Sequence, residues 1–193
     1  APKGTAVLCH PLPTHGGSKD HPVLWAIRNE LAANRGLTVV TFNFRGVMGS
    51  EGSFAGGEEE ADVDAAIGRA REEAAGPTLL AGWSFGAHTA LRHAVSDDRV
   101  AALALVGLPL GDAAAERLAL PDPESLGLFD RPVLIVAGQI DHFSPEPDMR
   151  SLARRLPGAE VRVVPNTDHF FHRRERELAE LVGEFADRAL APA

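Results

Sequence analysis

The sequence predicts an α/β fold in which one mostly parallel, six-stranded sheet carries helices on both faces. Six short apolar segments alternate along the chain with segments whose apolar residues recur at helical spacing. The strand-like segments are apolar throughout, as expected when helices cover both faces of a parallel sheet. The 193 residues contain no internal repeat, low-complexity segment or linker. We therefore expect a single domain over residues 1–193.

The first half of the chain predicts three strand–helix units. Pro22 suits the first turn of a helix, with Asp20 or His21 as its cap. Acidic residues open the next helix at its positive end, and Gly76-Pro77 ends it. We expect strands at 5–9, 37–44 and 78–81, and helices at 21–34, from about 58 to 74 and from about 85 to 95.

The second half predicts three more strands, at 100–106, 133–137 and 160–164. A helix surrounds Met149 to Leu156, and the clearest helical stripe is C-terminal, formed by Leu178, Leu181, Val182, Phe185 and Ala189. Residues 107–131 read as irregular, with a short helix around 113–118. We expect this segment to form a low rim beside the site rather than a large lid.

Composition and charge exclude several classes of function. A net charge of −8 argues against a nucleic-acid partner, which would need a basic face. No apolar segment approaches the roughly 20 residues that span a membrane, and from Ala1-Pro2-Lys3 onward we expect a strand rather than a signal peptide. The sequence lacks a starting Met, so a processed or trimmed N-terminus is left open. The single cysteine, Cys9, excludes an internal disulfide and is compatible with a reducing cytoplasm. We expect a cytoplasmic protein with a small-molecule partner, no nucleic acid and no membrane; no oligomeric state is indicated.

The pentapeptide Gly82-Trp83-Ser84-Phe85-Gly86 joins an apolar strand to a helix through a sharp turn. Such a turn needs small residues at both ends because the backbone of its central serine is strained and crowded. A serine there projects from the top of the sheet, at a helix N-terminus that favours developing negative charge. Ser84 is therefore the candidate nucleophile.

A serine nucleophile needs a base, and the base needs an orienting acid. His169 follows the last strand and Asp141 follows the fifth, so both lie at the edge where a parallel sheet places its chemistry. The order Ser84, Asp141, His169 is the chain order of this class of site. His172, His88 and His93 are the rival bases, and Asp168 is the alternative acid.

Acyl transfer also needs two backbone donors for the oxyanion. The Phe85 amide directly follows the nucleophile. In the loop after the first strand, Pro11 and Pro13 have no N–H, which leaves the amide of Leu12. The candidate substrate-binding residues are Arg45, Met48, Trp83 and Phe170, for which loop bracing or ordinary packing is the competing interpretation.

No cofactor or metal is expected. Gly46, Gly49 and Gly52 do not form a phosphate-binding loop, because no Lys-Ser/Thr follows them. His169, His172 and Asp168 do not have the spacing of H-E-x-x-H, and no cysteine joins them. Cys9 is interpreted as a small buried residue.

Together these segments resemble an α/β-hydrolase over nearly the whole chain. The most similar group is that of small, predicted bacterial α/β-hydrolases of dienelactone-hydrolase-like size. The residues that carry the likeness are His10-Pro11-Leu12-Pro13 with Gly16-Gly17, Phe42-Asn43-Phe44-Arg45-Gly46, the Gly82–Gly86 turn, and Asp168-His169-Phe170-Phe171-His172. The resemblance implies an acyl-enzyme mechanism with Ser84 as nucleophile, His169 as base and Asp141 as its partner, but no particular substrate.

The chain departs from the family pattern in three places. It has His-Pro where His-Gly is usual after the first strand, which places more weight on the Leu12 amide. It begins at what would be the third strand of the eight-stranded fold. A dienelactone hydrolase proper would also have a cysteine where this chain has Ser84.

We expect a serine hydrolase that acts through an acyl-enzyme, as a carboxylesterase or thioesterase on small to medium soluble acyl substrates. A peptidase or an acyltransferase would use the same triad. A non-catalytic binding protein on a hydrolase fold is the alternative from another class.

Overall fold

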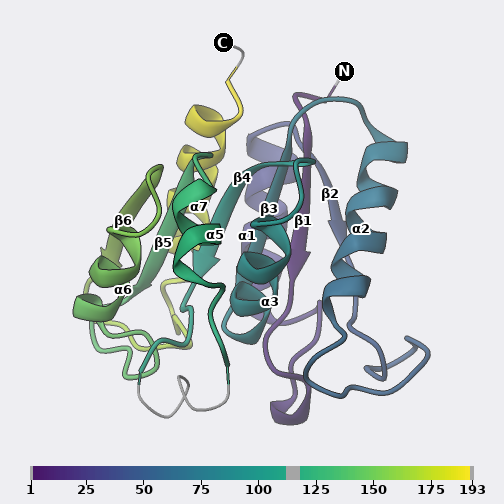
Figure 1. The fold of residues 1–193 in the computed structure, drawn as a ribbon. Helices are drawn as coiled ribbons and strands as arrows, with labels where there is room; N and C mark the ends of the chain where they lie inside the picture. The colour runs from purple at the N-terminus through teal and green to yellow at the C-terminus, as the bar shows by residue number, and fades with distance from the viewer. Residues whose placement is uncertain (1, 112–117, 192–193) are drawn as a thin grey trace.

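A single six-stranded sheet with all strands parallel runs through the centre of the computed structural model, which describes residues 2–111 and 118–191 (Figure 1). The strand order is β2-β1-β3-β4-β5-β6. The strands are β1 (Thr5–Cys9), β2 (Thr38–Thr41), β3 (Thr78–Trp83), β4 (Val100–Val106), β5 (Val133–Gly138) and β6 (Ala159–Val164). The predicted fold class is confirmed.

The order of the strands reverses around β1. This strand pairs with β2 on one side and with β3 on the other, and the chain then proceeds outward through β4 and β5 to β6. In an open parallel sheet, ligands bind beyond the carboxyl ends of the strands at such a reversal. The end of β3, where Ser84 follows, is therefore a favoured position for a site.

Helices cover both faces of the sheet. α1 and α7 pack on one face, and α2, α3 and α6 pack on the other (Figure 1). The helices are α1 (Pro22–Asn29), which continues as the π-helix η2 (Glu30–Asn34), α2 (Glu60–Glu73), α3 (Phe85–Ala94), α5 (Pro123–Leu128), α6 (Glu146–Ala153) and α7 (Glu175–Ala189), with a 3₁₀ turn η1 (Pro13–His15). None of the helices in the described ranges is both long and apolar enough to cross a membrane.

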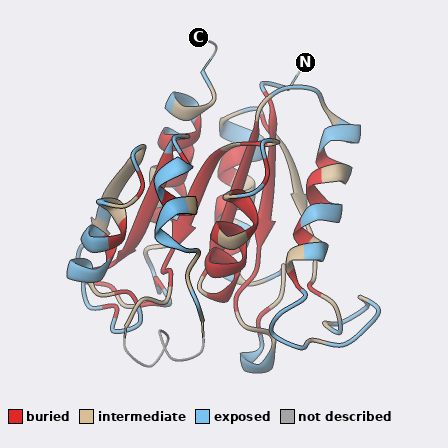
Figure 2. Ribbon diagram, in the orientation of Figure 1, coloured by how far each residue is buried: buried red, intermediate tan, exposed pale blue. Residues whose placement is uncertain are grey.

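Successive residues of each central strand enter opposite cores. Val7 and Cys9 join the core under α2 and α3, whereas Ala6 and Leu8 join the core under α1 and α7. This two-sided burial, visible as uniformly buried central strands in Figure 2, explains why the strand segments are continuously apolar.

The structure departs from the sequence predictions most clearly after β2 and in the segment 107–131. β2 ends at Thr41 rather than at Phe44, and the Phe44 amide donates to the His10 ring instead of to a strand. The segment 107–131 contains α5, which the sequence reading missed although Asp122 caps it and Pro123 opens it. The short helix expected around 113–118 falls mostly outside the described residues.

Candidate active site

Ser84 occupies a strained turn between β3 and α3. Its φ of 56° and ψ of −122° lie in a region that non-glycine residues rarely adopt. Both glycines of the pentapeptide are required by close approach. A Cβ on Gly82 would lie 2.2 Å from the Gly86 carbonyl oxygen, and one on Gly86 would lie 2.2 Å from the Cys9 carbonyl oxygen. The local sequence therefore builds the turn that the pattern predicts.

The structure brings His169 and Asp141 to Ser84. The His169 Nε2 atom lies 2.9 Å from Ser84 Oγ, and Nδ1 lies 2.8 Å from Asp141 Oδ2. Asp141 Oδ1 accepts hydrogen bonds from the amides of Phe143 (2.9 Å) and Ser144 (3.1 Å). Because the carboxylate can only accept, the proton of neutral His169 lies on Nδ1 and leaves Nε2 free to accept from the serine hydroxyl.

Gly107, directly after β4, makes room for the His169–Asp141 pair. Its φ is +51°, and a Cβ there would lie 3.1 Å from two ring atoms of His169 and 3.4 Å from Asp141 Oδ2. The sequence reading missed this residue. The available signal was a glycine that immediately follows a fully apolar strand.

Aromatic side chains hold the His169 ring on several sides. Trp83 donates from Nε1 to the His169 carbonyl oxygen at 3.2 Å, and its ring centroid lies 5.8 Å from the imidazole. The Phe143 ring lies 4.8 Å away and was not singled out from the sequence. Trp83 is only 2% exposed, so the expectation that it lines the substrate pocket is corrected: it supports His169 from beneath.

Three other candidate substrate residues have different surroundings. Arg45 pairs with Asp62 (3.0 Å) and Glu58 (2.7 Å), so its guanidinium joins the loop after β2 to the start of α2. Met48 is 74% exposed in the loop after β2. Phe170 is 45% exposed with its ring 5.6 Å from the imidazole, which keeps it beside the site.

The rival bases and the alternative acid have other partners. His88 bonds to the Ala119 carbonyl oxygen, and His93 bonds to Asp97. His172 is exposed, stacks on Phe170 and lies before the start of α7. Asp168 accepts from the Phe170 amide and so shapes the loop.

Cys9 is fully buried, and that burial raises the pKa of its thiol far above the ordinary value.

The loop after β1 packs directly against the turn that carries Ser84. A Cβ on Gly86 would lie 2.6 Å from the His10 carbonyl oxygen, so α3 begins in contact with this loop. Within the described residues, neither the Leu12 amide nor the Phe85 amide donates to a protein acceptor. Both predicted backbone donors thus remain available.

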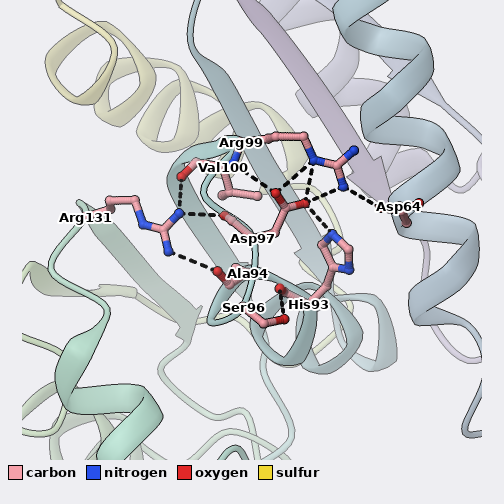
Figure 3. Close-up of polar contacts among 8 residues, drawn as sticks. All are labelled: Asp64, His93, Ala94, Ser96, Asp97, Arg99, Val100 and Arg131. Carbon is pink, nitrogen blue, oxygen red and sulfur yellow. Dashed lines mark hydrogen bonds and ion pairs between the residues drawn. The ribbon is translucent and has the colours of Figure 1, made fainter.

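Asp64, His93 and Asp97 gather at the opposite end of the sheet, with one potential ligand atom of each within 4.8 Å of the others (Figure 3). The Arg99 guanidinium already pairs with both carboxylates. Nearby, Arg131 donates to the carbonyl oxygens of Ala94, Asp97 and Val100. We interpret this cluster as an ion-paired brace that ties α2 to α3 and β4, in which Arg99 supplies the positive charge.

Replacing Asp97 by asparagine should lower the free energy of unfolding by about 2 kcal/mol at pH 7. Burial alone would raise the pKa of the Asp97 carboxyl, but hydrogen bonds from Arg99 and His93 hold it well below the usual range. A depressed folded-state pKa stabilises the protein above the unfolded value, and this contribution fades as the pH falls below about 5. Urea unfolding of wild type and Asp97→Asn from pH 7 to pH 3 should show the difference between their unfolding free energies decreasing.

The exposed neighbour Asp98 provides the control for this prediction, because Asp98→Asn removes the same charge outside the brace. It should change the unfolding free energy by less than about 0.5 kcal/mol. A gap between wild type and Asp97→Asn that stays constant with pH would contradict the assignment.

Comparison with known proteins shows similarity over nearly the whole chain. The family model described as an alpha/beta hydrolase domain matches residues 4–190. An α/β serine hydrolase without a lid from Xanthomonas campestris is 29% identical, with a TM-score of 0.81 over 100% of this chain and 85% of that one. An α/β serine hydrolase homologue from Coxiella burnetii is 30% identical, with a TM-score of 0.77 over 94% and 84% of the two chains. An uncharacterized protein of Rickettsia prowazekii is 25% identical over 93% of this chain and 77% of its own length.

The family model matches nearly the whole chain, and the all-parallel sheet with a sharp turn at Ser84 agrees with that match. This protein belongs to the α/β-hydrolase family.

Proposed function

We propose that the protein is a serine hydrolase that forms an acyl-enzyme, acting as a carboxylesterase or thioesterase on small to medium soluble acyl substrates. One observation carries the proposal: a single imidazole, that of His169, bridges Ser84 Oγ and Asp141 Oδ2 at hydrogen-bond distances. The serine is partly exposed while His169 and Asp141 are buried, so only the nucleophile is presented to solvent.

In the acylation step, Ser84 Oγ attacks the carbonyl carbon of the substrate as His169 Nε2 takes the hydroxyl proton. The imidazolium that results carries a proton on each nitrogen, and Asp141 stabilises it through Nδ1. The tetrahedral intermediate then collapses. The bond to the alcohol or thiol breaks, and the leaving group takes the proton from Nε2.

The amides of Phe85 and Leu12 would stabilise the oxyanion of that intermediate. The first is fixed at the N-terminus of α3, where the helix dipole favours negative charge. The second comes from the loop that packs against Gly86. Donors fixed in place before the reaction are worth more than mobile ones because no reorganisation is needed as charge develops.

Deacylation repeats the chemistry with water in place of the alcohol. His169 removes a proton from the water, the oxygen attacks the acyl carbon, and Ser84 Oγ leaves with the proton from Nε2. The free acid departs and the enzyme is restored. Water is the only co-reactant that this balance requires, and no atom changes its oxidation state.

The surroundings of Ser84 favour substrates that approach from solvent. Phe143 and Phe170 are 54% and 45% exposed beside His169 and offer apolar surface to an acyl or alkoxy group. The 25 residues from Gly107 to Arg131 include α5 but are short for a large lid. A soluble ester or thioester fits this open arrangement better than a lipid aggregate.

A leaving-group series tests the proposal. One acyl group, butyryl, is presented as the p-nitrophenyl ester, the phenyl ester and a thioester, with methanol added as a competing acceptor. If all three pass through the same acyl-enzyme, the ratio of methyl butyrate to butyrate should be identical for each. Ratios that change with the leaving group would contradict a common acyl-enzyme.

The same assay separates the alternative functions. Faster turnover of butyryl amides than of esters would indicate a peptidase, and transfer to alcohol that exceeds hydrolysis would indicate an acyltransferase. A preference for long-chain triglyceride emulsions over short esters would contradict the assigned substrate class. A binding protein would give neither turnover nor covalent labelling by a fluorophosphonate.

A further inference from the structure

His10 is a fully buried histidine whose two ring nitrogens are both engaged. The Phe44 amide donates to Nε2 at 2.9 Å, and Nδ1 lies 2.7 Å from the Pro11 carbonyl oxygen. An amide can only donate and a carbonyl can only accept, so Nε2 must be bare and Nδ1 must carry the proton. The contacts therefore select one neutral tautomer. Burial also lowers the pKa of His10, against the opposing effect of its bond to Pro11.

The carbonyl that His10 binds belongs to the same peptide unit as the Leu12 amide. This peptide is trans, so its C=O and N–H point in opposite directions within one plane. Fixing the oxygen against His10 therefore fixes the direction of the Leu12 N–H, away from the histidine. The other side of Leu12 is also held, because its carbonyl oxygen accepts from the amides of His15 and Gly17.

Gly17 supports the same peptide from behind. A Cβ at this position would lie 2.1 Å from the Pro11 carbonyl oxygen and 2.6 Å from its carbon. These distances leave no room for a side chain, so the backbone of Gly17 packs directly against the Pro11–Leu12 peptide. His10 and Gly17 together leave the Pro11 carbonyl little freedom to rotate.

The aromatic contacts of His10 connect this loop to the turn that carries Ser84. Its ring packs edge-on against Phe44 at 4.7 Å between centroids, and Phe44 packs in the same manner against Phe85 at 5.7 Å. Phe85 carries the other amide assigned to the oxyanion. A continuous series of ring contacts therefore connects His10, which holds the peptide of the Leu12 amide, to Phe85, which carries the other amide.

We propose that His10 is a positioning residue, which in its Nδ1-protonated neutral form holds the Pro11–Leu12 peptide so that the Leu12 N–H faces the oxyanion formed at Ser84. The inference rests on the proposed function and assigns a task to a residue outside the triad. Because the oxyanion exists only in the transition state and intermediate, losing His10 should lower kcat and leave KM nearly unchanged.

Two conservative variants divide the two hydrogen bonds of His10. The side-chain amide of His10→Asn can place an N–H where Nδ1 lies and donate to the Pro11 carbonyl oxygen. The longer side chain of His10→Gln can place an oxygen where Nε2 lies and accept from Phe44 but does not supply the bond to Pro11. The proposal predicts that His10→Asn keeps kcat within about tenfold of wild type, whereas His10→Gln loses on the order of 10²-fold.

His93→Gln is the matched control, because it alters another buried histidine at the opposite end of the sheet. Each variant is assayed with p-nitrophenyl butyrate, and its fluorophosphonate labelling is measured beside its urea unfolding curve. Equal losses in His10→Asn and His10→Gln, or a rise in KM alone, would overturn the positioning role. In both cases an active, labelled wild type would leave the proposed function intact. A wild type that neither turns over nor labels would remove both.

A second measurement requires no variant and therefore does not depend on folding. Long-range ¹H–¹⁵N correlation spectra of the wild type report which ring nitrogen of each histidine carries the proton. The expected result is a proton on His10 Nδ1 only, unchanged when a fluorophosphonate occupies Ser84. A proton on Nε2, or on both nitrogens, would overturn the inference.

Discussion

Ser84→Ala should lower kcat/KM for p-nitrophenyl butyrate by on the order of 10⁴-fold or more and abolish fluorophosphonate labelling. The Oγ atom is the one that bonds to the acyl group, and nothing else in the site replaces it. Residual turnover would come from the oxyanion donors and substrate binding alone. Mass spectrometry of the intact protein after exposure to the probe measures the loss of labelling directly.

The fold should survive this substitution. Alanine has the same Cβ as serine, so the strained φ of 56° is neither relieved nor worsened, and only the hydrogen bond to His169 is lost. The unfolding free energy should change by less than about 1 kcal/mol. Ser96→Ala, in the turn that follows the C-terminal end of α3, is the matched control and should label as wild type does. Labelling that persists in Ser84→Ala would show that another residue is the nucleophile.

The fold was predictable because its signals are local. Each strand of a doubly covered parallel sheet must be apolar on both sides, and each helix must carry an apolar stripe, so both patterns appear directly in the sequence. The turn at Ser84 was predictable from its own pentapeptide. Gly82 is required by a contact within that turn, whereas Gly86 is required by its close approach to Cys9 in β1. The positions of His169 and Asp141 followed from one topological rule, that chemistry gathers at the carboxyl ends of parallel strands.

The supporting residues could not be predicted because their roles depend on contacts between distant segments. Trp83 is adjacent to the nucleophile in sequence, but its ring faces the core and its Nε1 reaches the His169 carbonyl 86 residues later. Gly107 has a positive φ and also leaves room for the His169–Asp141 pair, which comes from segments far along the chain. His10 reaches the Phe44 amide 34 residues later. Arg45 follows a strand end, as a substrate-binding residue would, yet its guanidinium is occupied by Asp62 and Glu58.

Asp141→Asn should lower kcat by on the order of 10⁴-fold at pH 7 while leaving the fold and KM close to those of wild type. The reason lies in the two oxygens of Asp141. Oδ1 accepts from the amides of Phe143 and Ser144, so the asparagine oxygen must take that position to avoid placing one donor against another. The new NH₂ group then faces His169 Nδ1, which can no longer carry a proton there.

The imidazole must respond by moving its proton to Nε2, where it faces Ser84 Oγ and cannot accept from it. Acylation would fail although every heavy atom stays in place, and ring ¹⁵N spectra of His169 should show the opposite tautomer from wild type. Asp168→Asn is the discriminating control. It alters the neighbouring carboxylate, which accepts from the Phe170 amide and, among the described residues, from no other donor. The kcat should stay within about tenfold of wild type. A larger loss of kcat in Asp168→Asn than in Asp141→Asn would show that Asp168, and not Asp141, is the acid that orients His169.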